Sequence, residues 1–277
     1  MKNLNLAEML DNVRARTPLV HNITNYVTVN DCANILLACG GSPIMSDDAG
    51  DVEDITSICG GLNINIGTLN ARTIPAMYLA GKRANELEHP VLLDPVGAGA
   101  SRLRTETAAG LLDALKLSVI RGNISEIKAL AQGSATTKGV DADEADQLNA
   151  ANQDSVIAFA KGLAEKTGAV IAITGATDVI TDGERVCLIR NGHPMMSRIT
   201  GTGCMLSAMT TAYVVANPER PFEAVCAAVC AMGLCGEIAH ARLSAADGNS
   251  SYRNYIIDAV YNLTGAQLEE GAKYECL

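Results

Sequence analysis

The stretch Ile199-Thr200-Gly201-Thr202-Gly203-Cys204-Met205-Leu206 begins with glycines and passes directly into an apolar segment. The pattern predicts a loop that runs into a helix, whose free N–H groups and dipole would bind an anion. The candidate anion hole consists of Gly201, Thr202, Gly203 and Cys204. A thiol in the first helical turn is also expected to have a lowered pKa. A plain helix start with flexible glycines is the alternative.

Upstream of this loop, short runs rich in β-branched residues alternate with longer stretches of helical periodicity. The runs are 62–66, 91–93, 119–120 and 170–174, and the helical stretches are 27–38, 52–59, 74–87, 105–115 and 155–166. Such alternation is typical of βαβ units. It predicts an α/β fold, with a mostly parallel central sheet flanked by helices on both faces.

The second half of the chain departs from this alternation. Segments 179–181 and 186–189 flank Asp182-Gly183, a turn signal that predicts a hairpin and an antiparallel edge to the sheet. From residue 202 onward the pattern is helical, near 203–215, 221–241 and 251–263. The polar segment 133–153 lacks periodicity and is a candidate exposed excursion.

Composition limits the classes of function. The 277 residues are expected to form one domain, residues 1–277, with 48% apolar residues to fill a core. The formal charge of -10 argues against a broad surface for nucleic acid or anionic lipid. The longest apolar stretch, 224–236, is shorter than the ~20 residues needed to span a bilayer and is predicted to be a buried helix. With no signal-like N-terminal segment, we expect a cytoplasmic protein without membrane or nucleic-acid partners.

Three further segments carry polar residues at expected strand ends. Asp94 follows 91–93 and precedes Pro95 and two glycines; it either holds a metal or water, or caps a turn. Asn123 and Glu126 are spaced as a capping box, yet a helix start beside Arg121 is also an anion site at which Glu126 would orient hydrated Mg²⁺.

The third such segment, residues 173–178, places Thr174 and Gly175 after a strand, which suits either contact with a nucleotide or a tight turn. Two familiar nucleotide-binding patterns are missing from the sequence. The chain has no GxxxxGK[ST] phosphate loop, and neither glycine cluster completes GxGxxG, so a Rossmann dehydrogenase is disfavoured.

Taken in chain order, the segments at Asp94, at 121–126, at 173–178 and at 199–206 resemble the ribokinase-like superfamily. The match narrows to the hydroxyethylthiazole kinases of thiamine salvage. Residues 18–27 resemble the opening motif of that family and 42–46 its thiazole-contacting loop. Cys204 stands where ribokinase relatives usually carry Asp. The resemblance covers nearly the whole chain.

The resemblance implies an enzyme that uses Mg²⁺ and ATP to phosphorylate the hydroxyl of 4-methyl-5-(2-hydroxyethyl)thiazole. It also implies a homotrimer with active sites near subunit boundaries. The residues it assigns are Arg121, Thr174 and Asn123 for ATP, Glu126 and Asp94 for the metal, Met45, Asn25 and Gly201 for the thiazole, and Cys204 for catalysis.

Two roles for Cys204 remain open: a thiolate that accepts the hydroxyl proton, or a small residue that shapes the pocket. Phosphoryl transfer depends mainly on positioning and charge, so a weak base or none can suffice. The nearest rival function is a kinase for another small alcohol, such as hydroxymethylpyrimidine. Rivals from other classes are an ATP-dependent dehydratase of the same superfamily and a nucleotide-binding module without catalysis.

Overall fold

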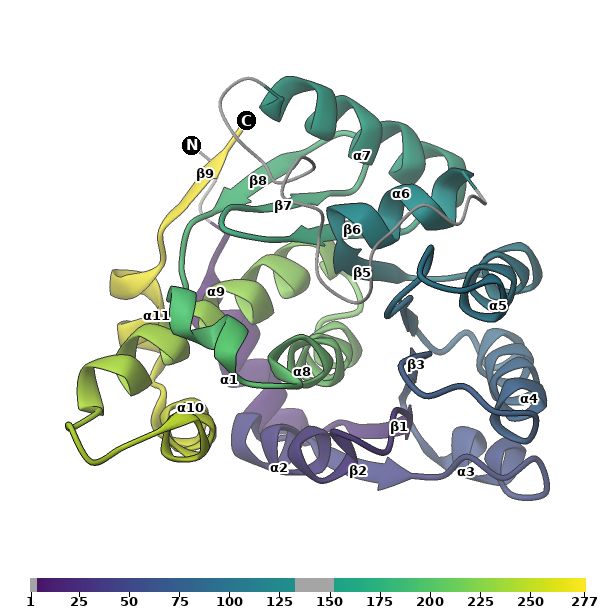
Figure 1. Cartoon of the computed structure of the whole chain (residues 1–277), viewed down its shortest axis with the longest axis horizontal. Coiled ribbons are helices and arrows are strands. Elements are labelled where there is room, and N and C mark those ends of the chain that lie inside the picture. The colour runs from purple at the N-terminus through teal and green to yellow at the C-terminus, as the bar shows by residue number, and fades with distance from the viewer. Residues whose placement is uncertain (1–3, 133–151) are drawn as a thin grey trace.

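The protein is described here from a computed structural model, which covers residues 4–132 and 152–277 and contains one sheet of nine strands (Figure 1). The strand order is β2-β1-β3-β4-β5-β6-β7-β8-β9. Neighbours from β2 to β6 pair in parallel, and β7, β8 and β9 are added antiparallel. The strands are β1 (Leu19–Ile23), β2 (Ser42–Met45), β3 (Gly61–Asn65), β4 (Val91–Asp94), β5 (Val119–Asn123), β6 (Val170–Thr174), β7 (Asp178–Thr181), β8 (Val186–Ile189) and β9 (Tyr274–Cys276).

Helices cover both faces of this sheet, and each face has its own apolar cluster. One face packs against α3 (Val52–Ile58), α4 (Thr73–Glu86), α5 (Arg102–Ala114), α6 (Ile124–Gln132) and α7 (Gln153–Thr167). On the other face, the sheet packs against α2 (Val29–Cys39), α8 (Thr202–Ala216) and α9 (Pro221–Arg242). Outside these lie α1 (Leu6–Arg16), α10 (Asn249–Asn262) and α11 (Gly265–Gly271), which pack on the helices and complete the second cluster. Alternate strand side chains supply both clusters, as a sheet buried on both sides requires.

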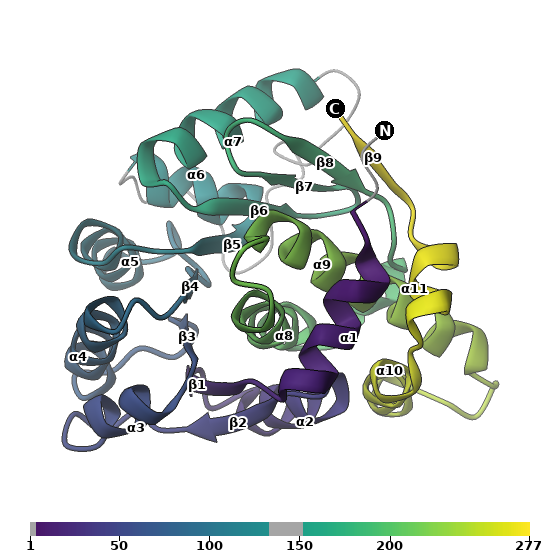
Figure 2. The same ribbon diagram turned by 180° about the vertical axis from the view of Figure 1, so that it is seen from behind.

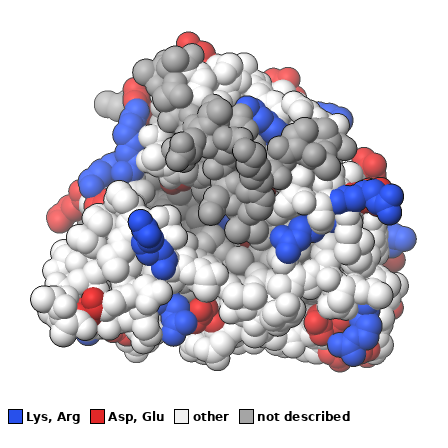
Figure 3. Space-filling view, viewed as in Figure 1, with Lys and Arg blue, Asp and Glu red and all other residues white. Residues whose placement is uncertain are grey.

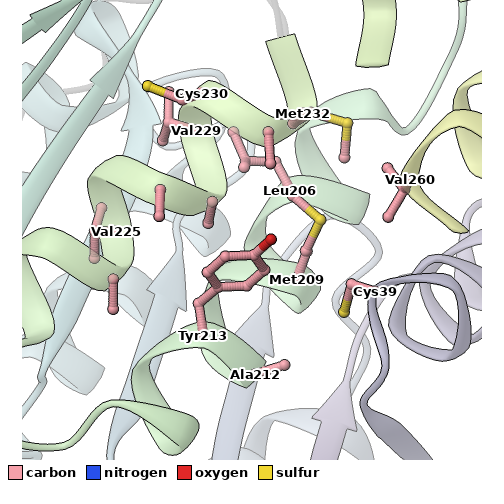
Figure 4. Packing of buried hydrophobic residues seen from close by; sticks show 14 of the residues in the cluster. Cys39, Leu206, Met209, Ala212, Tyr213, Val225, Val229, Cys230, Met232 and Val260 are labelled. Carbon is pink, nitrogen blue, oxygen red and sulfur yellow. The ribbon is translucent and has the colours of Figure 1, made fainter. Parts of the chain in front are cut away.

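The sheet curves around α8 and α9, which lie in its hollow in both views (Figures 1 and 2). Figure 4 shows Leu206 and Met209 of α8 beside Val229 of α9, with the ring of Tyr213 among them. Fully burying one such aliphatic side chain contributes about 1.5–3 kcal/mol. This packing fixes α8 against β1, β3 and β4, and with it the glycine loop that precedes the helix.

Among the described helices, α9 alone is long and apolar enough to cross a membrane, but 83% of its apolar window is buried inside the fold. The prediction of a buried helix there is confirmed. On the face shown in Figure 3, the described Lys and Arg side chains lie apart from one another among mostly uncharged atoms.

The alternation predicted from the sequence is confirmed, although several boundaries differ by a few residues. The run 170–174 is β6, and 179–181 and 186–189 form the β7–β8 hairpin. One expectation is wrong. Residues 42–45 form strand β2, paired in parallel with β1, and only Ser46 lies in the loop beyond it. Of the segment 133–153, residues 133–151 lie outside the described residues, and Gln153 begins α7.

Candidate active site

Four neighbouring parallel strands end on polar residues: Asn65 in β3, Asp94 in β4, Asn123 in β5 and Thr174 in β6. Asn65 is in register with Asp94, and Asn123 with Thr174. The carboxyl ends of parallel strands are where α/β folds bind ligands. The start of α8 packs over the same edge, so the segments chosen from the sequence converge here.

Asp94 is completely buried. Its Oδ2 accepts hydrogen bonds from Asn65 Nδ2 at 2.8 Å and Ser207 Oγ at 2.7 Å, and lies 3.6 Å from Arg121 Nη1. Within the described residues its Oδ1 has no hydrogen-bond partner. Burial raises the pKa of Asp94, and the nearby Arg121 charge opposes that rise. The carboxyl group is thus held by one oxygen, with the other free to accept.

Arg121 lies between the strand ends and the glycine loop. Its Nη2 donates to Thr174 Oγ1 at 2.7 Å. A Cβ added at Gly203 would lie 2.6 Å from Nη1, so the guanidinium can approach the start of α8 only because residue 203 is glycine. A fixed positive charge therefore stands beside the candidate anion hole, where helix N–H groups already favour an anion.

Gly201 is the N-cap of α8 and has a φ of 89°. That is the left-handed region, which glycine adopts without strain. A side chain there would also collide with Thr28. Gly201 is therefore required by the turn that begins α8, and the turn presents Thr202, Gly203 and Cys204 in the first helical residues.

Glu126 forms the capping box predicted from its spacing with Asn123. Its Oε2 accepts from Asn123 N at 2.9 Å, and Glu126 N donates to Asn123 Oδ1 at 2.8 Å. Its Oε1 accepts from Gly97 N at 2.8 Å. Burial, and then the charge of Asp94, raise the pKa of Glu126 to about 7. Both oxygens already hold backbone N–H groups, so contact with a hydrated ion fits this carboxylate better than direct ligation.

Cys204 accepts two carboxamide hydrogen bonds at Sγ, from Asn25 Nδ2 at 3.2 Å and Asn65 Nδ2 at 3.3 Å. Burial, and then the charge of Asp94, raise the pKa of this thiol. The expectation of a lowered pKa from the helix start is therefore wrong. Desolvation and a like charge outweigh the helix dipole and the hydrogen bonds that favour the thiolate.

Met45 lines a separate cleft of about 280 Å³ at the ends of β1 and β2. The other residues lining it are Asn22, Thr24, Tyr26, Val29, Ser46, Asp47, Thr68, Asn70 and Thr73. Thr24 and Tyr26 belong to the cleft, and Asn25 between them donates to Cys204. Of the three residues expected on the thiazole side, Met45 lines this cleft, Asn25 contacts Cys204, and Gly201 begins the helix that carries Cys204.

Sequence reasoning missed three polar residues of this site: Asn65, Ser207 and Asp178. Asp178 is buried with a pKa raised by burial to about 7, and its Oδ1 accepts from Gly175 N at 2.9 Å, which closes the turn after β6. Asn65 was detectable as a polar residue at the carboxyl end of an apolar run. Ser207 had no comparable signal, because a small hydroxyl residue is common in a buried helix.

The fold and the strand-end site define a ribokinase-like kinase. The solved pyridoxal kinase of Staphylococcus aureus shares the fold, with a TM-score of 0.60 and 16% identity over 94% of this chain and 97% of that one. A hydroxyethylthiazole kinase structure from Pyrococcus horikoshii OT3 is nearer, with a TM-score of 0.87, 33% identity and 98% of both chains covered.

Sequence comparison narrows the class. The hydroxyethylthiazole kinase of Clostridium acetobutylicum is 66% identical over 270 residues, which cover 98% of this chain and 99% of the relative. The model of the hydroxyethylthiazole kinase family matches residues 10–266. The chain belongs to the hydroxyethylthiazole kinase family.

Proposed function

We propose that the protein transfers the γ-phosphoryl group of ATP to the hydroxyl of 4-methyl-5-(2-hydroxyethyl)thiazole, in thiamine salvage. The observation that carries the proposal is the meeting of Arg121, Asp94 and the glycine-rich start of α8 at one sheet edge, in a chain of this family. A fixed cation, helix N–H groups and a buried carboxylate are the groups that phosphoryl transfer requires.

In this proposal each group has a distinct task. The N–H groups from Gly201 to Cys204 and the Arg121 guanidinium hold the negative charge of the transferring phosphoryl group. Thr174 fixes the guanidinium through its 2.7 Å hydrogen bond. The substrate hydroxyl lies near Cys204, with the thiazole ring in the Met45 cleft. The raised thiol pKa favours a pocket-shaping role for Cys204 over a thiolate base.

We further propose that Mg²⁺ binds at this site together with ATP. Within the described residues, no group of three or more His, Cys, Asp or Glu could hold a metal by itself. The chemistry of Mg²⁺ fits this, since it commonly binds one or two carboxylates together with substrate phosphates and waters. Asp94 offers the unpartnered Oδ1, and Glu126 would hold a metal-bound water. The ion would neutralise phosphate charge at this edge.

The homotrimer and the cytoplasmic location also remain proposals. Tyr26, which lines the Met45 cleft together with Val29, is 78% exposed, and the next residue in the chain, Val27, is 55% exposed. Apolar groups exposed at the mouth of a site favour cover by a neighbouring subunit. All nine cysteines are free thiols, as expected in a reducing compartment. The continuous sheet supports the expectation of a single domain.

The rival functions differ in their products. A kinase for hydroxymethylpyrimidine would use the same ATP site with another pocket, whereas a dehydratase or a binding module would yield no phosphorylated alcohol. Membership of the hydroxyethylthiazole kinase family favours the thiazole over each of them.

The test offers ATP and Mg²⁺ with hydroxyethylthiazole, hydroxymethylpyrimidine, ribose or pyridoxal, and identifies products by mass. Phosphorylated thiazole alone is expected, and an Asp94→Asn variant should not form it, which excludes a contaminating kinase. Product from a different alcohol alone would overturn the substrate assignment. No product from any would overturn the kinase proposal itself.

A further inference from the structure

Asn65 is a buried residue, only 1% exposed, and its side chain makes four hydrogen bonds. Its Oδ1 accepts from Asn25 Nδ2 at 3.0 Å and from Gly67 N at 2.9 Å. Its Nδ2 donates to Asp94 Oδ2 at 2.8 Å and to Cys204 Sγ at 3.3 Å. Every donor and the acceptor of this carboxamide are therefore in use.

These partners allow only one orientation of the amide. Gly67 N–H can only donate, so it must face Oδ1. A flipped amide would place NH₂ against that N–H and a carbonyl oxygen against the Asp94 carboxylate. The NH₂ end is consequently fixed toward Asp94 and Cys204, which lie on different elements, β4 and α8.

The neighbours of Asn65 hold the same two groups from their other sides. Asn25 also donates to Cys204 Sγ, and Ser207 also donates to Asp94 Oδ2. The thiol sulfur thus receives N–H groups from two carboxamides, which restrains its rotamer. Asn65 is the member of this network that contacts both the thiol and the carboxylate.

We propose that Asn65 is a positioning residue, which sets the place of the Cys204 side chain relative to Asp94 at the start of α8. The kinetic part of this inference rests on the proposed function. Buried hydrogen-bonded supports of this kind act on rate through geometry, and small misplacements near reacting atoms are costly.

Asn63 provides a matched control. It lies two residues earlier on β3 and is also fully buried, on the same side of the strand. Its Nδ2 donates to Asn22 Oδ1 at 3.0 Å, and among the described residues it makes no hydrogen bond to Cys204 or Asp94. Asn65→Ala and Asn63→Ala therefore remove comparable buried amides from the same strand.

The kinetic test compares kcat and KM for both variants, each also combined with Cys204→Ala. We expect Asn65→Ala to lower kcat by about fivefold or more with little change in KM, and Asn63→Ala to retain kcat. In the Cys204→Ala background the loss from Asn65→Ala should shrink to less than about twofold. An equal loss in both backgrounds would overturn the inference.

A second measurement needs no turnover, so it separates this inference from the proposed function. Cys204 and Cys276 are the two partly exposed thiols, and the other seven are buried. Iodoacetamide labelling followed by peptide mass analysis should show Cys204 alkylated several-fold faster in Asn65→Ala, because its sulfur is released, and at the wild-type rate in Asn63→Ala. An unchanged Cys204 rate in Asn65→Ala would contradict the proposal. If Asn65→Ala does not fold, Asn65→Ser serves in both experiments with the same expectations.

Discussion

Loss of the proton from Glu126 should make the ligand-free protein less stable as pH rises through neutrality. Its pKa is raised from 4.5 to about 7, mainly by burial and then by the Asp94 charge. The folded state therefore binds a proton between these values that the unfolded state has released. The stability this protonation gives is fully present below about pH 4.5 and is lost as pH passes 7.

The size of the effect follows from the same two values. A rise of the pKa from 4.5 to about 7 corresponds to about 3 kcal/mol, most of which falls between pH 5 and pH 8. Glu126→Gln removes this titration. It also places an NH₂ group against one of the backbone N–H groups of Gly97 and Asn123, so a folded but less stable protein is expected at pH 5.

Urea unfolding of both proteins at pH 5, 6, 7 and 8 measures this difference. The difference in unfolding free energy between the wild type and Glu126→Gln should shrink as pH rises. The control is Glu106→Gln, because the exposed Glu106 side chain pairs only weakly with Arg102, and its difference from the wild type should stay constant. Parallel curves for the wild type and Glu126→Gln would refute the reasoning. At pH 7 the variant should also lose Mg²⁺-dependent turnover; unchanged activity would leave Glu126 only its capping role.

Three other predictions concern single side chains. Cys204→Ala should lower kcat by no more than about tenfold, since its thiol is held protonated; a loss beyond about 100-fold, restored by Cys204→Asp, would favour a base. Gly203→Ala should displace Arg121 and weaken binding of a non-hydrolysable ATP analogue roughly tenfold by calorimetry, whereas Gly162→Ala, with open space at its Cβ, should bind normally. Tyr213→Phe should raise the unfolding free energy by about 1 kcal/mol, because its buried hydroxyl has no partner among the described residues; Tyr252→Phe, which loses a 2.9 Å bond to Gly236 O, should lower it by a similar amount.

Local pattern was sufficient for much of the fold. The run 170–174 is β-branched and bounded by polar residues, and it is β6 to the residue. Strand β1 was not recognised because its buried His21 and Asn22 interrupt the apolar run. Strand β2 contains Pro43, which argues against a strand except at an edge, where it lies. Strand β9 is three residues long and is defined by pairing with β8, which no local window contains.

Only some of the site residues could likewise be predicted from the sequence. Asp94, Arg121 and Thr174 could be chosen because they follow or end recognisable strands, and the structure brings them together. The protonation of Cys204 could not be predicted, because it depends on burial and on Asp94, more than a hundred residues away in the chain. Asn65 was missed for a related reason: its importance comes from partners supplied by three other segments.

Because the site residues lie at the very ends of adjacent strands, the sheet itself fixes the distances between them. Neighbouring strands are held about 4.8 Å apart by their ladder hydrogen bonds, whatever the length of the helix that connects them. Insertions in α4, α5 or the following connections would leave the spacing of Asn65, Asp94 and Thr174 unchanged. A slip of one residue within a single strand would instead turn its terminal side chain to the opposite face. Evolution can therefore lengthen or trim the outer layer freely, while the strands themselves tolerate no change of register.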